Sequence, residues 1–384
     1  MIARFLLAFG LAILMVATGI GSFLYLQGHQ SRVAIAPQKP TQASPRPSVF
    51  FLPGTLYFAQ SGALYSLEAG RFHQLTQEDG WMQPALYPDG SGMLAVRRNA
   101  FYSDVYVLNR FGSVVAQLTT NGAQGYCKTD TGANQWSFYP RLSPDERTIY
   151  MSYDGPKYYC LGFLDYNVNM SIWNVPFGGS IKQGQSWSTP NDYTGGDMQP
   201  VPLPTGGIIY TKYSYDSDGN RVGQLWYTNR PGPSGRAITS QAADCAEPSL
   251  SPNGAEIAMI CTYGKQISYL TIASWNGSNL GPLQTVISDQ LVAQPIWAPD
   301  GTGIAYLAPA SPDGPFQLWF LPQLAYHQPV PSPIPTPLPT PGGPYTGVLP
   351  SPTPIPPPPP VVIKPIQMTT NLGFDATSPM TWAA

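Results

Sequence analysis

The sequence predicts an all-β fold built from one recurring two-strand unit. In five places a proline opens a short apolar segment that leads through a turn such as Pro-Asp-Gly into a second apolar segment. Proline fixes φ, an Asp or Asn side chain bonds its own backbone, and glycine allows positive φ, so these turns favour paired strands. The 44 prolines, 38 glycines and 12% aromatic residues also suit short strands better than helices. The units start at Gln83, Tyr139, Gln199, Glu247 and Gln294.

The spacing of these units predicts a six-bladed β-propeller. Their opening prolines lie 56, 60, 48 and 47 residues apart, at or somewhat above the usual length of a four-stranded blade. A sixth proline of the same kind, Pro379, follows Pro295 by 84 residues. Subtracting a 35-residue proline-rich insert, residues 328–362, leaves 49 residues, which matches the neighbouring blades. The spacing therefore favours six blades over five.

Both ends of the chain are expected to share one blade. Segments 55–59, 63–67 and 71–76 have the pattern of second, third and fourth strands with no first strand before them. The residues after Pro379 have the pattern of an opening strand without the rest of its blade. Because an open propeller exposes strand edges that favour aggregation, we expect the C-terminal strand to close the ring. The propeller domain is therefore assigned to residues 54–384.

The N-terminal segment predicts a link to a membrane. Residues 5–26 contain no charged side chain and are long enough to cross a bilayer as a helix. We assign residues 1–26 to a transmembrane signal anchor, with a cleaved signal peptide as the alternative, and residues 27–53 to a proline-rich linker. An anchor would make this a single-pass cell-membrane protein with an extracytoplasmic propeller. Cleavage would make it secreted or periplasmic.

The repeat resembles a bacterial propeller family. The pattern Pro-x-x-Ser-Pro-Asp-Gly-x-x-Ile-Ala is similar to the WD40-like, or PD40, repeats of TolB-like six-bladed propellers, over roughly residues 54–328 and 363–384. This resemblance implies a fold and not one activity. TolB-like proteins carry a small α/β domain before the propeller, where this chain has an apolar segment and a linker, so the Tol-Pal role is not carried over. Prolyl oligopeptidases also contain propellers, but the Gly-x-Ser-x-Gly motif of their hydrolase domain is missing.

Four cysteines in an exported chain predict disulfide bonds. Cys245 and Cys261 flank one predicted hairpin and would lie nearly opposite each other on its two strands. Cys127 and Cys160 flank another hairpin, at a greater distance from its turn. We therefore predict the pairs Cys127–Cys160 and Cys245–Cys261, the alternative being four unpaired buried thiols.

Long insertions gather on one face of the predicted propeller, around its third and fourth blades. They join second to third strands or successive blades. They comprise residues 121–137, 154–170 and 182–198, with a shorter insertion at residues 213–222. Exposed aromatic side chains among amides and carboxylates suit recognition of another molecule. The predicted binding rim consists of Trp136, Tyr158, Tyr159, Tyr166, Trp187 and Tyr193, the alternative being that these aromatics pack one loop on another.

These features together predict a recognition or scaffold module of the bacterial cell envelope. The expected partner is an envelope protein, a peptide or a glycan, and residues 5–26 would supply the contact with the membrane. Nucleic acid is excluded as a partner class because the formal net charge is −2 and no basic run exceeds two residues. We expect no cofactor.

No catalytic or metal site is expected from the sequence. The three histidines lie far apart and beside no cysteine or carboxylate cluster, which argues against zinc or a histidine-dependent triad. The segment from Asp216 to Asn220 resembles the start of a calcium loop, but the glycine at the sixth position and the later glutamate of such a loop are missing, so a hairpin turn is favoured. Two alternatives stay open: a glycan-active enzyme using two rim carboxylates such as Asp154 and Asp192, and a purely structural envelope protein.

Overall fold

The structure is a computed structural model and describes residues 51–123, 131–155, 168–265, 267–323, 364–370 and 372–384. The chain divides into two units, Met1–Phe50 and Phe51–Ala384. The expected membrane segment at residues 5–26 and the insert at residues 328–362 lie outside the described residues. In the part of the chain that the structure describes, no helix is both long and apolar enough to span a membrane.

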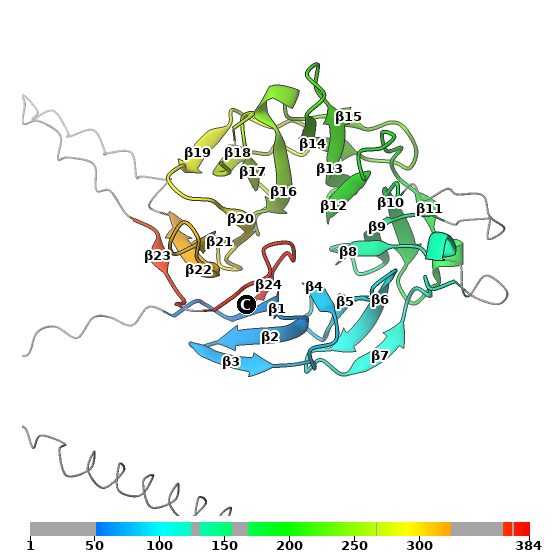
Figure 1. The fold of residues 1–384 in the computed structure, drawn as a ribbon, viewed down its shortest axis with the longest axis horizontal. Coiled ribbons are helices and arrows are strands. Elements are labelled where there is room, and N and C mark those ends of the chain that lie inside the picture. Colours follow the sequence, from blue (N-terminus) through cyan, green and yellow to red (C-terminus); the bar gives the residue numbers. More distant parts are fainter. Residues whose placement is uncertain (1–50, 124–130, 156–167, 266, 324–363, 371) are drawn as a thin grey trace, which may run out of the picture. The chain divides into compact units, whose positions relative to one another are not determined.

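The unit Phe51–Ala384 is a six-bladed β-propeller, as the repeat predicted. Six antiparallel sheets of four strands follow one another around a central axis (Figure 1), and we call the region along this axis, where the innermost strands face one another, the channel. Blade 1 contains β24 (Thr381–Ala383), β1 (Thr55–Gln60), β2 (Ala63–Glu68) and β3 (Arg71–Gln74). Blade 2 contains β4 (Trp81–Leu86), β5 (Gly92–Arg98), β6 (Ser103–Asn109) and β7 (Val114–Gln117). Blade 3 contains β8 (Ser137–Leu142), β9 (Thr148–Tyr153), β10 (Ser171–Pro176) and β11 (Gln185–Ser186).

The second half of the ring repeats this order, with the innermost strand named first. Blade 4 contains β12 (Asp197–Pro202), β13 (Ile208–Tyr215), β14 (Arg221–Thr228) and β15 (Arg236–Ala237). Blade 5 contains β16 (Cys245–Leu250), β17 (Glu256–Cys261), β18 (Tyr269–Ser274) and β19 (Gln284–Ile287). Blade 6 contains β20 (Ala293–Trp297), β21 (Gly303–Pro309), β22 (Phe316–Pro322) and β23 (Ile366–Gln367). Short 3-10 helices lie at Thr131–Ala133, Ile181–Gln183 and Gln241–Ala243.

The C-terminal strand closes the ring, which confirms the expectation from the two chain ends. β24 pairs antiparallel with β1, placing Trp382 opposite Leu56. The Trp382 indole Nε1 also donates a hydrogen bond of 2.6 Å to the Pro53 carbonyl. Gly54 makes this close approach feasible, because it has a φ of 67° and a Cβ there would lie 2.0 Å from the Ala383 carbonyl oxygen.

The Pro-Asp-Gly turns form as their residue types predict. The Asp89 carboxylate accepts the backbone N–H of Ser91 at 2.8 Å, and Asp300 accepts that of Thr302 at 3.0 Å. Asn253 accepts the N–H of Ala255 at 3.0 Å in the same way. Each side chain thus bonds the backbone two residues on, which stabilises the turn between the first two strands of its blade. These recurring aspartates have a structural role.

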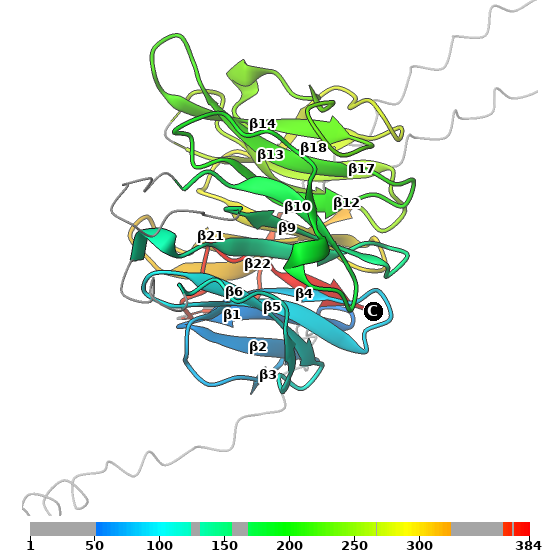
Figure 2. The same cartoon turned by 90° about the vertical axis from the view of Figure 1, so that its right-hand side faces the viewer.

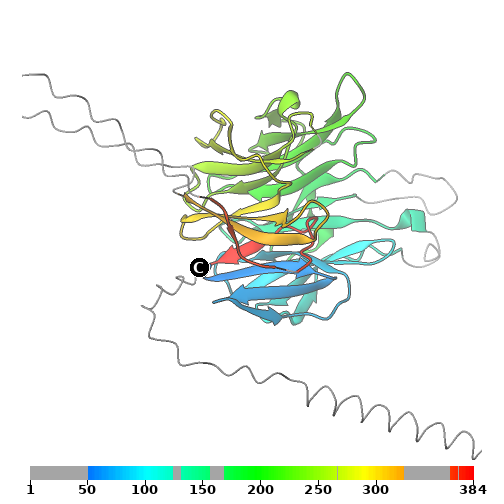
Figure 3. The ribbon, with the colours of Figure 1, turned by 60° about the vertical axis from the view of Figure 1, so that its left-hand side comes forward.

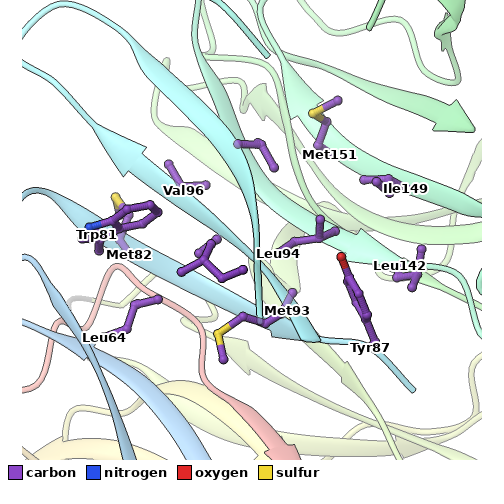
Figure 4. Packing of buried hydrophobic residues seen from close by; sticks show 14 of the residues in the cluster. Leu64, Trp81, Met82, Tyr87, Met93, Leu94, Val96, Leu142, Ile149 and Met151 are labelled. Carbon is purple, nitrogen blue, oxygen red and sulfur yellow. The ribbon is translucent and has the colours of Figure 1, made fainter. Parts of the chain in front are cut away.

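The core lies between neighbouring blades. In β5, Met93, Leu94 and Val96 are fully buried and belong to one cluster with Leu64 of blade 1 and Ile149 of blade 3 (Figure 4). Blades stack on both sides of each sheet, so successive side chains of a middle strand are buried on either face. This explains why the second strands have continuous apolar runs and not a simple polar alternation.

Alternating strand directions give the propeller two faces, seen edge-on in the side views (Figure 2) (Figure 3). We call the side with the connections between first and second strands the turn face. The opposite side, with the connections between second and third strands and between blades, is the insertion face. Two insertions are shorter than expected. In the insertion at residues 213–222, β13 ends only at Tyr215 and β14 already begins at Arg221. In the insertion at residues 182–198, β11 occupies two residues. Parts of the others, residues 124–130 and 156–167, are outside the described ranges.

One of the two predicted disulfides is confirmed. Cys245 in β16 and Cys261 in β17 are direct register partners and form a disulfide bond across the pair. The bond fastens the innermost strand of blade 5 to the second strand. Cys127 and Cys160 lie outside the described residues.

Candidate functional site

The innermost strands of blades 2 to 6 share one β-bulge, at the residue before the opening proline. The register of each strand against the second strand of its blade shifts at this point. These residues have φ between 50° and 57°, which non-glycine residues seldom adopt. Because bulges redirect a side chain and carry strain, their recurrence indicates a constraint at the channel. The bulge residues are Gln83, Tyr139, Gln199, Glu247 and Gln294.

Side chains at the bulge position connect successive blades around the channel. Each acceptor takes the backbone N–H of the bulge residue in the next blade. The bonds run from Gln83 N–H to Ser378 Oγ (2.7 Å), Tyr139 N–H to Gln83 Oε1 (2.6 Å), Glu247 N–H to Gln199 Oε1 (3.0 Å) and Gln294 N–H to Glu247 Oε2 (2.6 Å). Gln294 Nε2 continues the series to the Ala376 carbonyl at 2.9 Å. Among the described residues no such bond joins blades 3 and 4, where a tyrosine takes the place of an amide.

The channel holds a cavity of about 370 Å³. Its wall comes from the innermost strands of blades 3 to 6 and from the closing strand β24. Pro252 and Pro299, which belong to the turns between first and second strands, also line the cavity. It therefore lies at the turn-face end of the channel, opposite the face on which the sequence placed the binding rim. Trp297 and Trp382 contribute aromatic surface to the wall.

Glu247 supplies a titratable carboxyl group to this wall. Its Oε2 accepts the Gln294 backbone N–H, and its Oε1 accepts the Gln294 side-chain amide at 3.1 Å. Burial raises the pKa of Glu247 to about 7, against the opposing effect of the bond from the Gln294 backbone. Burial, with a smaller contribution from Glu247, raises the pKa of Tyr213 to about 12. The carboxyl therefore changes charge near neutral pH, while the phenol remains protonated.

Arg141 supplies a cation to the same wall. Its Nη1 donates to the Pro84 and Pro140 carbonyls at 3.4 and 3.3 Å. Burial lowers the pKa of the guanidinium to about 10, so it remains charged at neutral pH. The neighbouring Tyr139 also lines the cavity, and burial raises the pKa of its phenol well above the ordinary value. The cavity thus combines a cation, a phenol and a carboxyl group within a wall of mixed polar and apolar residues.

Two of the predicted rim residues lie at the surface to different extents. Tyr193 is 78% exposed, and its carbonyl accepts the hydroxyl of Tyr215 at 2.8 Å. Trp136 is partly buried, because its ring stacks on Phe138 with the centroids 5.8 Å apart. The guanidinium of Arg98 lies 5.9 Å from the Trp136 ring centre, within cation–π range.

Trp187 is buried, so its side chain is not part of an exposed rim. It is 8% exposed and meets Tyr150 edge to face, with ring centroids 5.1 Å apart. Its backbone N–H donates to the Ile172 carbonyl at 2.6 Å, which extends the β10–β11 pairing by one residue. This continued pairing directs the indole into the apolar cluster that contains Ile208 of blade 4. The sequence places Trp187 in a loop, whereas the structure makes it a core residue between blades 3 and 4.

The remaining rim residues, Tyr158, Tyr159 and Tyr166, lie outside the described residues. The described polar side chains of the insertions bond one segment to another. Gln135 Nε2 donates to the Gly155 carbonyl at 2.6 Å, and Asn191 Nδ2 donates to the Tyr213 carbonyl at 2.8 Å. These bonds organise the loops.

The residues considered for catalysis or calcium have different surroundings in the described structure. Asp154 Oδ1 accepts the Asn169 backbone N–H at 3.1 Å, whereas Asp192 is exposed to solvent. The Asp216 carboxylate accepts the N–H groups of Asp218 and Asn220 at 2.9 and 2.8 Å, so the expected hairpin turn is confirmed. Among the described residues, no group of three His, Cys, Asp or Glu side chains is placed to hold a metal ion.

Sequence reasoning missed the charged residues of the channel, although the repeat contained a signal for them. Arg141 lies two positions after its bulge residue. The residues at that position in the other five blades are Ala85, Val201, Ser249, Ile296 and Met380, which carry no charge. Alignment of the repeats thus marks Arg141 as exceptional. It does not tell which side of the bulged strand faces the channel.

Comparisons with known proteins support the fold. No family model matches the chain, and no curated protein matches it. Among solved structures, TolB from Acinetobacter baumannii is similar, with a TM-score of 0.51 and 16% identity over 70% of this chain and 61% of that chain. Hydrazine synthase from Kuenenia stuttgartiensis gives a TM-score of 0.51 and 12% identity over 70% of this chain and 43% of that chain. A putative TolB from Agrobacterium tumefaciens gives a TM-score of 0.49 and 13% identity over 70% of this chain and 84% of that chain.

The likeness to the Acinetobacter protein confirms the expected TolB-like six-bladed propeller at the level of fold. The chain spans less than two thirds of the Acinetobacter protein. The same fold also occurs in hydrazine synthase. A shared propeller therefore does not decide between binding and catalysis, and the function has to be argued from the site.

Proposed function

We propose that this chain is a recognition module of the bacterial cell envelope that binds a segment of a partner protein in the channel of its propeller. The observation that carries the proposal is the 370 Å³ cavity at the turn-face end of the channel. A preformed cavity that combines apolar wall and a few polar groups is the usual form of a binding site. The closed ring behind it limits the ordering that association would require, which favours affinity.

The rigid wall of this cavity suits an inserted protein segment. Trp297 is 5% exposed and held by a 3.0 Å bond from its indole to the Ser249 carbonyl, so its ring is a fixed part of the wall. Rigid aromatic walls with a few hydrogen-bonding groups suit the side chains of an inserted peptide segment.

The proposed localisation, a membrane tether at residues 5–26 with an extracytoplasmic propeller, rests on the apolar sequence there.

A glycan-active enzyme is less well supported at this site. Glycoside hydrolysis ordinarily uses two carboxyl groups. Among the described residues that line the cavity, Glu247 is the only carboxyl group. Recognition requires no second acid, so it remains the function that the cavity supports best.

The test is a binding experiment with a cavity-filling variant. A random octapeptide library is selected against the immobilised full-length chain and against its Ser249→Trp variant. Ser249 is small and lines the cavity, so an indole at this position would occupy part of the volume. We expect the wild type to select peptides that bind the Ser249→Trp variant at least about tenfold more weakly, a loss of about 1.4 kcal/mol.

A matched surface variant distinguishes the channel from the insertion face. Trp136→Ala combined with Tyr193→Ala alters the two described rim residues that reach the surface and leaves the cavity lining intact. Channel recognition predicts that the selected peptides bind this variant as they bind the wild type. Peptides that lose affinity for the surface variant and keep it for Ser249→Trp would transfer the site to the insertion face. Thermal unfolding of each variant shows whether the fold is retained.

A further inference from the structure

We propose that the channel cavity recognises a carboxylate on the partner segment and that Arg141 is the residue that binds it. This inference rests on the proposed function, because it assigns a ligand chemistry to the same cavity. It concerns one charged group whose presence the fold itself does not explain. Its support comes from the repeat, from the bonding of the guanidinium and from the charges around it.

The repeat shows that the propeller does not need an arginine at this position. Arg141 pairs with Tyr150 just after the bulge of β8, and the equivalent residues pair with the second strand in the same way. Ser249 and Ile296 are equivalent residues that also line the cavity, and neither is charged. A serine or an apolar side chain therefore satisfies the packing at this place. An arginine there has a role other than closing the strand pair.

The bonding of Arg141 leaves most of its guanidinium available. A guanidinium has five N–H donors in a planar fork. The hydrogen bonds found for Arg141 are the two from Nη1 to the Pro84 and Pro140 carbonyls, and both are longer than is usual for an N–H···O bond. Within the described part of the chain, no carboxylate forms an ion pair with Arg141. A partly buried cation of this kind is stabilised strongly when an anion approaches it.

The surrounding groups favour a carboxylate over a more highly charged anion. Tyr139 lies near both charged residues, since its pKa is raised by Glu247 and lowered by Arg141 after the larger effect of burial. Its phenol stays protonated at neutral pH, and Tyr139 and Arg141 line the same cavity. Glu247 is partly ionised at neutral pH and so adds negative charge to the cavity, which would repel a phosphate dianion more than a single carboxylate. A single carboxylate matches the fork of Arg141 with less repulsion.

The test compares charged and uncharged forms of the same peptides. Peptides selected on the wild-type full-length chain are synthesised as free acids, with the C-terminus amidated, and with Asp or Glu replaced by Asn or Gln. We expect one carboxylate to be common to the selected peptides and its removal to weaken binding about 10- to 100-fold. Loss on amidation would identify the C-terminal carboxylate as the source. Loss on replacement of Asp or Glu would identify a side chain.

Two variants connect this effect to Arg141. Arg141→Met introduces the side chain found at the equivalent Met380, directly before the closing strand, so the repeat indicates that the fold accepts it. Arg141→Lys keeps the charge without the planar fork. The Met variant is expected to bind the charged and uncharged peptides equally, and the Lys variant to keep part of the difference.

The outcomes separate this inference from the proposed function. The carboxylate inference would be overturned by peptides that bind equally well in uncharged form and keep their affinity for Arg141→Met. If these peptides lost affinity for Ser249→Trp, channel recognition would still hold. Selection of no peptide with lower affinity for Ser249→Trp would overturn both. A retained difference between charged and uncharged peptides in the folded Arg141→Met variant would show that another residue binds the carboxylate.

Discussion

At the scale of single residues, the bulge before each opening proline determines what the channel contains. The backbone there has positive φ in five blades, so each side chain leaves the regular alternation of its strand. An amide at this position can accept an N–H from the next blade, as Gln83 and Gln199 do. Glu247 makes the same bond and brings in a proton that titrates near neutral pH. A carboxyl group at this one bulge position, where other blades have an amide, therefore makes the charge of the channel depend on pH.

This titration predicts a specific pH dependence of folding stability. The ordinary pKa of a glutamate, 4.5, rises to about 7 for Glu247 in the folded chain, so the folded state binds this proton more tightly than the unfolded state. The contribution to stability is therefore fully present below pH 4.5 and is lost as pH rises towards 7, by at most about 1.4 kcal/mol per pH unit. Glu247→Gln removes the proton and should flatten this part of the profile.

The quantity to measure is the difference in unfolding free energy between wild type and Glu247→Gln in urea, from pH 4 to pH 8. The pH-dependent contributions of the other carboxyl groups are the same in both proteins and cancel in this difference. We expect the wild type to become relatively less stable as pH rises through the window. A difference that stays constant over the whole range would show that Glu247 does not carry a raised pKa.

At the scale of elements, the strands and turns were predictable because their causes are local. Pro-Asp-Gly turns and apolar segments lie next to each other in the sequence, and the Asp89 and Asp300 turns form by bonds only two residues long. The environment of Trp187 was not predictable, because it depends on Ile208 from another blade. Arg141 stands out in the aligned repeats, but its exposure to the channel depends on the bulge in β8. The candidate site therefore required the three-dimensional arrangement, whereas the blades did not.

The confirmed disulfide belongs to this scale, since it fastens β16 to β17. Cys245 and Cys261 are separated by 16 residues in the sequence, and a crosslink closing a loop of this size stabilises a fold by about 3 kcal/mol. Cys245→Ala, Cys261→Ala and the double variant should each lose about this amount, because the crosslink needs both sulfurs. Urea unfolding measures the three losses. Small losses that simply add in the double variant would mean that the crosslink contributes little.

At the scale of the whole molecule, stability depends on closure of the ring by β24. Without this strand, the N–H and C=O groups of β1 become an open edge beside the channel. The β24 hydroxyl of Thr381 also bonds the Leu86 backbone N–H of blade 2 at 3.2 Å, so the strand connects two blades as well as completing one. Closure thus protects the sheet edge and holds the cavity wall in place.

Removal of residues 381–384 is therefore expected to lower the unfolding temperature and to cause concentration-dependent association. Removal of Ala384 alone is the control, since this residue is exposed and lies beyond the strand. Calorimetry and light scattering measure the two effects. A monomeric truncated protein with the wild-type unfolding temperature would contradict the role of β24 in closure.

Hydrogen exchange can locate where partners bind, which we propose is the channel at the turn face. Backbone amide exchange of the full-length chain is followed by mass spectrometry, with and without a saturating peptide from the wild-type selection. We expect slower exchange in the channel segments 199–203, 247–250 and 294–298. Protection confined to residues 131–137 and 187–196 of the insertion face, with the channel segments unchanged, would contradict it.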